Sequence, residues 1–362
     1  MDFDLSEDQL ALRDGARELL DGTSPPEAVR EVLEAGGGRH DGIWNAMVEQ
    51  GWLGVAVAEA DGGLGFGTVE LAVLLEEIGR HATPVPFAST VLAIDGLVRA
   101  GRTDDAARLV AGEAVGTVAW SARADAVRAR EEGGSWRLDG RADPTIYAPS
   151  AALALVVAAA PDGPALFRVD LEAIGRPAAE PAIDRTRELG WLDFTGAPAE
   201  RIGGADAVTA LLDRGALFAS AEMLGGAERV LELTVEYAKD RVQFGRAIGS
   251  FQAIKHKCAD MLVDVEGMRS TVYWAAWCIG ADDPDASVAA STAKVWSADA
   301  SKRVMADGLQ IHGGIGFTWE HDLHLFLKRA QLDQLTFGDA AFHRARLAAL
   351  LRPRVAAGTG VI

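Results

Sequence analysis

Two short segments in the second half of the chain combine side chains that could bind a ligand carrying phosphate groups. The first segment contains Arg241, Phe244 and Gln252, and the second contains Gln310 and Gly314. An arginine can bind a pyrophosphate through two hydrogen bonds, an aromatic ring can pack on an adenine, and an amide can hydrogen-bond the linker. Because glycine lacks a Cβ atom, neighbouring backbone amides can approach a phosphate oxygen. Each residue alone is typical of a solvated helix end or a core, so the prediction of a binding site depends on their occurring together.

Other reactive side chains give weaker signals. His312 lies within the second segment, where packing or helix capping is a commoner role than catalysis. Cys258 and Cys278 lie in apolar helical patterns without CxxC or nearby histidine spacing. This context predicts two buried, reduced thiols and no metal site.

The composition excludes several classes of protein. The chain has 362 residues, of which 49% are hydrophobic and 24% charged, so it can bury a large core and divide into two or three folding units. Its formal net charge of −18 opposes binding to nucleic acid phosphates, and no dense basic segment offsets it. No apolar stretch reaches the ~20 residues of a membrane helix, and the acidic start lacks the layout of a signal peptide. We therefore predict a cytoplasmic protein without membrane or nucleic acid partners.

The elements that must position these side chains follow a helix, strand, helix order. Apolar residues three and four positions apart predict helices between residues 5 and 101, with Ser6 as a candidate N-cap. Short apolar or alternating runs predict strands between residues 116 and 208, with a hairpin turn at residues 131–134. We predict an α+β fold with an N-terminal all-α domain (1–115), a central β-domain (116–208) and a C-terminal helical bundle (209–362). The helices expected in the bundle span residues 209–240, 250–281, 286–311 and 319–352.

The two segments, Arg241-Val-Gln-Phe-Gly with Phe251-Gln252 and Gln310-Ile-His-Gly-Gly-Ile-Gly316, resemble the flavin-binding signatures of acyl-CoA dehydrogenases. Residues 44–80 also resemble the N-terminal helical domain of that family. The resemblance covers nearly the whole chain and implies the acyl-CoA dehydrogenase fold, with a central β-sandwich or barrel and a C-terminal four-helix bundle. It implies FAD as the cofactor. The residues that would hold the ADP half of FAD are Arg241, Phe244, Gln252, Gln310 and Gly314, and the flavin would be seated mainly in a neighbouring subunit.

The catalytic base of that family has no counterpart at the positions where the resemblance places it. Dehydrogenation requires a carboxylate that removes the α-proton of the acyl thioester while the β-hydrogen leaves as hydride to the flavin. The residue at the usual base position is Phe337, and the residue at the position used by a second group of members is Gly215. Asp339 is the nearest candidate replacement, with an N-cap role as the alternative. We therefore keep Asp339 as a candidate base and assign no catalytic residue.

The parts of the site that would hold the flavin ring and the substrate also depart from the family pattern. Pro144 replaces the tryptophan that lies against the flavin in family members, and Ala216 replaces an arginine beside the acyl-CoA pocket. Trp120 or Tyr147 could substitute as an aromatic wall, although partly buried packing residues are the commoner reading. These departures indicate that the chain lacks a complete active site of its own.

The resemblance therefore leads to one main hypothesis and two alternatives. The main hypothesis is the base-lacking subunit of a heteromeric acyl-CoA dehydrogenase of the steroid-CoA type, which residues 316–324 and 336–341 resemble. A homologous partner, in an α2β2 heterotetramer, would bind the acyl-CoA and carry the catalytic glutamate, and an electron-transfer flavoprotein would accept the electrons. The alternatives are a self-sufficient homotetrameric dehydrogenase that uses Asp339, and a structural or regulatory paralogue without turnover.

Overall fold

The computed structural model describes residues 4–358, and these residues form two compact units. The first unit combines the chain up to Pro26 with Ala72–Thr83 and with the chain from Ala216 onward. The second unit combines Glu27–Leu71 with Pro84–Gly215. Each unit therefore draws on segments that are distant in the sequence, while the three consecutive domains inferred from element order stay a prediction.

The strands of the second unit close into a barrel. Six strands pair in the order β1-β5-β2-β3-β8-β6, and β5 also pairs with β6, which joins the sheet to itself. In the expected hairpin, β2 and β3 pair antiparallel, with Glu132 opposite Ser135. The strands are β1 (Gly116–Ala119), β2 (Val127–Glu132), β3 (Ser135–Arg141), β5 (Leu153–Ala160), β6 (Gly163–Asp170) and β8 (Asp193–Gly203), and β4 (Thr145–Ile146) pairs separately with β7 (Leu189–Gly190).

Helices of the second unit pack on this barrel. A Cβ atom at Gly96 would lie 2.5 Å from Leu155 Cδ1, so a side chain there would displace Leu155, and glycine lets helix α5 pack closely on strand β5. The helices are α2 (Pro26–Glu34), α3 (Asp41–Glu49), α5 (Phe87–Arg99), α6 (Thr103–Val110) and α7 (Leu171–Ile174), with short 3-10 turns η1 (Trp52–Gly54) and η2 (Glu59–Asp61).

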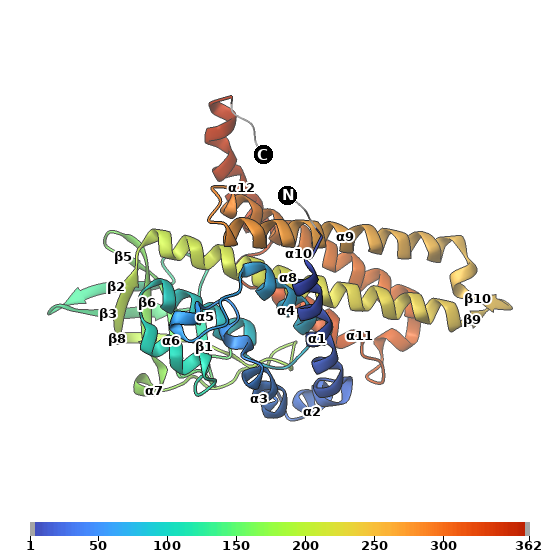
Figure 1. Cartoon of the computed structure of the whole chain (residues 1–362), viewed down its shortest axis with the longest axis horizontal. Coiled ribbons are helices and arrows are strands. Elements are labelled where there is room, and N and C mark those ends of the chain that lie inside the picture. The colour runs from blue at the N-terminus through green and yellow to red at the C-terminus, as the bar shows by residue number, and fades with distance from the viewer. Residues whose placement is uncertain (1–3, 359–362) are drawn as a thin grey trace. The chain divides into compact units, whose positions relative to one another are not determined.

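The first unit is built on three long helices, α8 (Ala205–Asp240), α9 (Gln252–Gly280) and α10 (Ala286–His312), of which α8 begins in the second unit. Helices α9 and α10 run antiparallel beside each other, as the short connection between them requires (Figure 1). The unit also contains α1 (Glu7–Thr23), most of α4 (Thr68–Arg80), the strands β9 (Val242–Gln243) and β10 (Arg246–Ala247), the 3-10 turns η3 (Ile248–Ser250) and η4 (Gly313–Phe317), and the helices α11 (Leu323–Leu335) and α12 (Ala340–Ala356). As expected, Ser6 caps α1, in a capping box with Gln9.

The last helix that we predicted, over residues 319–352, is wrong in one respect, because it is two helices separated by a turn. Helix α11 ends at Leu335, and Phe337 and Gly338 adopt left-handed backbone conformations with φ of 56° and 95°. Asp339 then caps α12 by accepting a hydrogen bond from the Phe342 backbone N–H at 2.8 Å. Two consecutive left-handed residues cannot continue a right-handed helix, so the helical pattern of the sequence is interrupted here.

Buried ion pairs fix α1 and α4 to the long helices. Arg269 of α9 and Tyr273 donate hydrogen bonds to Glu76 of α4, at 2.5 and 2.6 Å. Arg17 of α1 donates to Glu77, a neighbouring carboxylate that is fully buried, at 2.6 Å. Burial raises the pKa of Glu76, so its ionised form depends on these partners. We call the whole set the α4 ion network; its members are Arg17, Glu76, Glu77, Arg80, Glu228, Glu232, Arg269 and Tyr273.

The observed elements confirm the predicted fold class, a mainly helical chain with a central β-domain. Within the described residues, no helix combines the length and the apolar character needed to span a membrane. Cys258 and Cys278 are free thiols, as expected, but only Cys278 is buried. Cys258, on helix α9, is half-buried.

Candidate cofactor-binding site

The first predicted segment forms a hairpin that follows the end of α8. Strand β9 pairs antiparallel with β10, and a turn of Phe244 and Gly245 joins them (Figure 1). Both turn residues have positive φ, 53° and 77°, which matches the right-handed twist of a two-residue hairpin. Phe244 is 92% exposed, so nothing among residues 4–358 covers the ring that we expect to pack on an adenine.

The start of helix α9 lies directly behind this hairpin. Its N-cap is Phe251, whose side chain makes no hydrogen bond to the first turn, and its first residue is Gln252. The Phe251 ring also contacts the Phe244 ring edge to face, with centroids 6.0 Å apart. The N–H groups of a first helical turn without a side-chain cap carry partial positive charge and suit an anionic ligand. The exposed amide of Gln252 therefore lies where a diphosphate would be stabilised.

The second predicted segment ends helix α10 beside the end of α8. Tyr237 of α8 stacks on His312, with ring centroids 4.4 Å apart, and its hydroxyl donates to the His312 carbonyl at 3.4 Å. One helical turn later, the Arg241 backbone N–H donates to the Tyr237 carbonyl at 2.9 Å. These contacts bring Arg241 to the same end of the helices as Gln310 and Gly314, both of which are exposed.

His312 has the packing role that we expected. It is buried, and its Nδ1 lies 2.8 Å from the Gly308 carbonyl, to which it donates. Burial lowers the pKa of His312, so the ring stays neutral against Tyr237. Gly313 then ends α10 with φ of 61°, and a Cβ atom at Gly314 would meet nothing within 4 Å. The backbone at Gly314 is therefore open to a ligand.

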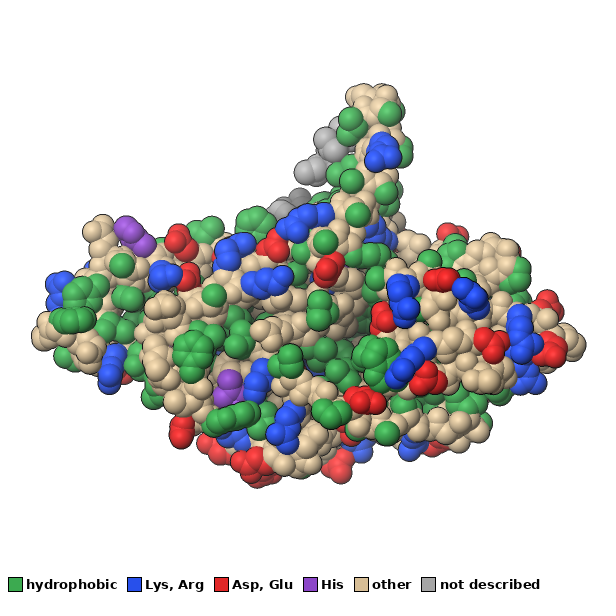
Figure 2. Space-filling model, turned by 180° about the vertical axis from the view of Figure 1, so that it is seen from behind, with side chains coloured by type: hydrophobic (Ala, Val, Ile, Leu, Met, Phe, Trp, Pro, Cys, Tyr) green, Lys and Arg blue, Asp and Glu red, His purple; other side chains and the backbone are tan. Residues whose placement is uncertain are grey.

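All five predicted cofactor-binding residues thus lie at one end of the helices of the first unit, and all five are exposed. Within residues 4–358, the guanidinium of Arg241 forms no ion pair or hydrogen bond with a protein side chain. In Figure 2, which is turned by 180° from Figure 1, basic and hydrophobic side chains lie next to each other at the left, where the hairpin of Figure 1 comes to lie. An unpaired cation, an exposed aromatic ring and an open glycine backbone fit the ADP half of a dinucleotide.

The two positions predicted for a catalytic base contain no carboxylate. Gly215 is buried within α8, and Phe337 lies in the turn between α11 and α12. Asp339 has the N-cap role described above, which was the alternative to its acting as a base.

Two buried basic side chains fix the turn that contains Phe337. Lys294 of α10 donates from Nζ to the carbonyl oxygens of Asp333, Gln334 and Gly338, at 2.8, 3.1 and 2.9 Å. His343 Nε2 lies 2.9 Å from the Phe337 carbonyl, to which it donates. Burial lowers the pKa of Lys294 to about 7 and that of His343 to about 4. The turn at the predicted base position is therefore held by hydrogen bonds from two buried basic side chains to backbone carbonyls.

In the β-domain, neither candidate for a substitute aromatic wall is freely exposed. Tyr147 is 1% exposed, and its hydroxyl donates to the Thr186 carbonyl at 3.4 Å, so it is a core residue. Trp120 is half-buried. Near the position of Pro144, Ser121 donates to Asp143 at 2.7 Å, which joins the two segments that would face a flavin ring in family members.

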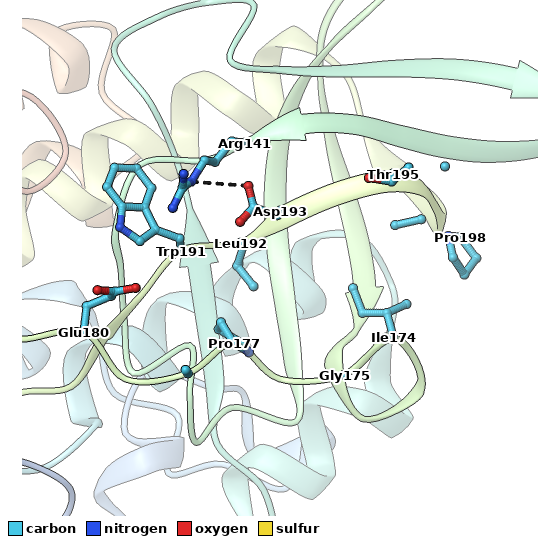
Figure 3. A pocket seen from close by; sticks show the side chains of 13 residues that line it. Arg141, Ile174, Gly175, Pro177, Glu180, Trp191, Leu192, Asp193, Thr195 and Pro198 are labelled. Atoms are coloured by element: carbon cyan, nitrogen blue, oxygen red, sulfur yellow. Dashed lines mark ion pairs between the residues drawn. The ribbon is translucent and has the colours of Figure 1, made fainter.

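The second unit also contains a surface hollow of about 510 Å³ between β3, β8 and residues 174–180. Its basic group, Arg141, lies over the Trp191 ring at 4.1 Å and pairs with Asp193 at 3.3 Å (Figure 3). Glu180 lines the same hollow. Because the guanidinium is already paired with a carboxylate, the hollow offers a phosphate little net positive charge.

Two features of the site were not predicted from the sequence. Tyr237 holds the two predicted segments together, and its only sequence signal is its place one helical turn before Arg241. Lys294 was missed because a lysine within a helical pattern gives no sign that its ammonium is buried. Across the described residues, no group of three or more His, Cys, Asp or Glu side chains could hold a metal ion.

Known proteins resemble this chain over almost its whole length. Two family models match, "Acyl-CoA dehydrogenase, N-terminal domain" over residues 6–116 and "Acyl-CoA dehydrogenase, C-terminal domain" over residues 203–351. The chain is 34% identical to acyl-CoA dehydrogenase IpdE2 of Mycolicibacterium smegmatis, covering 90% of this chain and 93% of that protein. It is 32% identical to acyl-CoA dehydrogenase FadE27 of Mycobacterium tuberculosis, covering 96% and 98%.

Two solved structures are similar in fold as well as in sequence. One is the ChsE4-ChsE5 complex of Mycobacterium tuberculosis, with a TM-score of 0.91, 32% identity, and coverage of 97% of this chain and 99% of the matching chain. The other is the Tcur3481-Tcur3483 steroid ACAD G363A variant, with a TM-score of 0.90, 32% identity and the same coverage. The two matching domain models, the similar relatives and the shared fold show that this chain belongs to the acyl-CoA dehydrogenase family, whose members are oxidoreductases that act on acyl-CoA.

Proposed function

We propose that this chain is the base-lacking subunit of a heteromeric, FAD-dependent acyl-CoA dehydrogenase. In this proposal it binds the ADP half of an FAD whose ring is seated in a homologous partner. The partner also binds the acyl-CoA and supplies the glutamate that removes the α-proton. The cofactor is FAD, which accepts the hydride in this family, and an electron-transfer flavoprotein then accepts the electrons.

The observation that carries the proposal is the turn between α11 and α12. Phe337 occupies the predicted base position, and its carbonyl accepts a hydrogen bond from His343 while that of Gly338 accepts one from Lys294. Asp339 is committed to the N-cap of α12. These contacts favour a chain without a base of its own over a self-sufficient enzyme that uses Asp339.

The exposed end of the helices that carries the predicted cofactor-binding residues, which we call the cofactor end, supports the proposal that the FAD is shared with a partner. Arg241, Phe244 and Gln252 are exposed although they carry the family's ADP-binding signature. A dinucleotide held only on this open end would leave its flavin ring free to enter a second protein. A shared site explains both the complete ADP-binding signature and the missing base, whereas a paralogue without turnover would explain only the missing base.

The relatives support a heteromeric assembly and a substrate class. The ChsE4-ChsE5 structure is described as a complex, and the Tcur3481-Tcur3483 structure as a steroid ACAD. We infer from these two that the assembly is an α2β2 heterotetramer and that the substrate is a CoA thioester of a steroid side chain.

The test is to co-express the chain with a homologue that has glutamate at either base position. Native mass spectrometry gives the stoichiometry, and flavin absorbance gives the FAD content of the complex and of the chain alone. We expect a flavin-poor isolated chain and one FAD for every two chains in the complex. One FAD per chain in the isolated protein, bleached by an acyl-CoA, would contradict the shared site and favour Asp339 as a base.

A further inference from the structure

A second arginine, Arg246, lies beside the predicted ADP-binding residues. Its guanidinium carbon is 4.1 Å from the centre of the Phe251 ring. Phe251 is the N-cap of α9 and also contacts Phe244 at the tip of the hairpin. Stacking on a ring restricts the orientation of a guanidinium, while the N–H groups at the edge of the guanidinium can still donate hydrogen bonds to an anion.

The register of the hairpin places Arg246 on the same face as Arg241. Gln243 lies opposite Arg246, and the Ile248 backbone N–H donates to the Arg241 carbonyl at 2.8 Å, so Arg241 lies opposite Ile248. Residues opposite each other share a face, as do residues two positions apart in a strand. The two arginines are therefore diagonal neighbours, with a typical separation of roughly 7–8 Å, within reach of one ligand for long side chains.

Neither arginine is neutralised by the protein. In the part of the chain that the structure describes, no carboxylate pairs with Arg241 or Arg246, although Asp240 directly precedes Arg241. In contrast, Lys239, two residues away, pairs with Glu236 at 2.5 Å. Two unpaired guanidiniums on one face, next to a helix start without a side-chain cap, match the two negative charges of a diphosphate.

We propose that Arg246 is a second diphosphate-binding residue, which acts with Arg241 on the ADP half of FAD. This inference rests on the proposed function and adds a residue to its cofactor site. Phe251 orients the guanidinium, and the diphosphate takes the place of the missing carboxylate. CoA also carries an ADP diphosphate, so the test must distinguish FAD from CoA.

The experiment uses the complex of this chain with its homologous partner and measures FAD affinity after removal and return of the cofactor. We expect Arg246→Met to weaken FAD binding by about tenfold or more, because a charge-assisted contact is lost. Arg246→Lys should fall between, since it keeps the charge and loses the planar fork. FMN has no ADP half, so the affinity of the complex for FMN should be unchanged in both variants.

Lys239→Met is the matched control. It removes one exposed positive charge from the same end of α8, but this charge is already paired with the carboxylate of Glu236. Its FAD affinity should equal that of the wild type. If Arg246→Met binds FAD like the wild type while Arg241→Met does not, the inference is wrong and the proposed function stands. If Arg246→Met weakens CoA binding and leaves FAD binding intact, the ligand assignment is wrong. A wild-type complex that binds no FAD would overturn the proposed function and this inference with it.

Discussion

Two arginines of this chain stack on an aromatic ring at the same distance, yet their electrostatic surroundings differ. Arg141 in the hollow of the β-domain lies 4.1 Å from the Trp191 ring and pairs with Asp193 (Figure 3). Arg246 in the hairpin lies 4.1 Å from the Phe251 ring and pairs with no carboxylate among residues 4–358. We therefore expect the carboxylate partner, and not the stacking, to separate a structural arginine from one that binds a ligand.

The α4 ion network extends the comparison to half-buried arginines, two of whose carboxylate partners, Glu76 and Glu77, are buried. There Arg269 contacts Glu76 and Glu228, and Arg80 contacts Glu228 and Glu232. A cation whose partners are protein carboxylates contributes to folding, because removing it leaves a buried charge uncompensated. A cation without such partners contributes little to folding and remains available to a ligand. Each class predicts a different response to mutation.

The largest effect should follow from the substitution Arg269→Met. It leaves Glu76, which is 3% exposed, without its cationic partner, and we expect the free energy of unfolding to fall by about 3 kcal/mol. Chemical denaturation of the purified chain measures this change. The control is Lys239→Met, since Lys239 pairs with Glu236 and the two side chains are 62% and 67% exposed, so its loss should cost less than about 1 kcal/mol. Equal losses of stability in the two variants would show that burial of an ion pair does not determine its contribution to folding.

The substitution Arg241→Met should have the opposite profile. We expect FAD binding by the complex to weaken by about 2 kcal/mol, or roughly 30-fold, because a hydrogen-bonded charge pair with the diphosphate is lost. The unfolding midpoint of the FAD-free chain should not change, since the side chain has no protein partner in the described structure. Both quantities can be measured on the same preparations, by flavin fluorescence and by denaturation.

Arg141→Met is the control for this prediction, because it removes a stacked arginine that already has a carboxylate partner. Its FAD affinity should match that of the wild type. Loss of FAD from this variant, together with normal binding by Arg241→Met, would place the cofactor contact in the β-domain hollow and reverse the comparison.

A buried basic group without a carboxylate partner within hydrogen-bonding distance should respond to pH. The pKa of Lys294 is lowered by burial to about 7, below its unfolded value of 10.5, so the folded state releases this proton first as the pH rises. The unfolded state then binds more protons, and stability should increase by up to about 1.4 kcal/mol per pH unit from about pH 7 to about pH 8, below the pKa of about 8.5 of an unperturbed cysteine thiol.

The measurement is the free energy of unfolding across that range, for the wild type and for Lys294→Met. The variant is expected to be less stable throughout, because three carbonyl oxygens lose their donor, and its stability should not rise with pH in this window. A variant that keeps the wild-type slope would show that another group titrates. The exposed Arg246 gives no such slope, since an arginine keeps its proton throughout this range.

The parts of the molecule that could be predicted from sequence are those whose signal is local. Arg241, Phe244 and Gln252 lie within twelve residues, and their hairpin and helix start are adjacent in the chain. The α4 ion network could not be predicted, because its charges come from four helices and pair only after those helices pack. The helix break at Phe337 was indicated only by the N-cap alternative for Asp339, since one glycine in a continuing helical pattern does not reveal two left-handed residues.

Among glycine variants, the smallest effect on stability should come from Gly314, at the end of helix α10. A Cβ atom at Gly314 meets nothing within 4 Å, so Gly314→Ala should change the free energy of unfolding by less than about 0.5 kcal/mol. At Gly225 the same atom would lie 1.8 Å from the Glu76 carbonyl oxygen, so Gly225→Ala should cost about 1–3 kcal/mol by forcing α4 and α8 apart. Denaturation of both variants measures this contrast, which separates a glycine needed for packing from one that packing leaves free.

The cofactor affinity of Gly314→Ala then decides what the open glycine is for. If a diphosphate approaches the backbone there, the added methyl group should weaken FAD binding by the complex while leaving the FAD-free chain as stable as before. This is the same profile as that of Arg241→Met, in which stability and binding respond independently. A variant that keeps full FAD affinity would place the cofactor away from the end of α10 and leave the hairpin arginines as its only tested contacts.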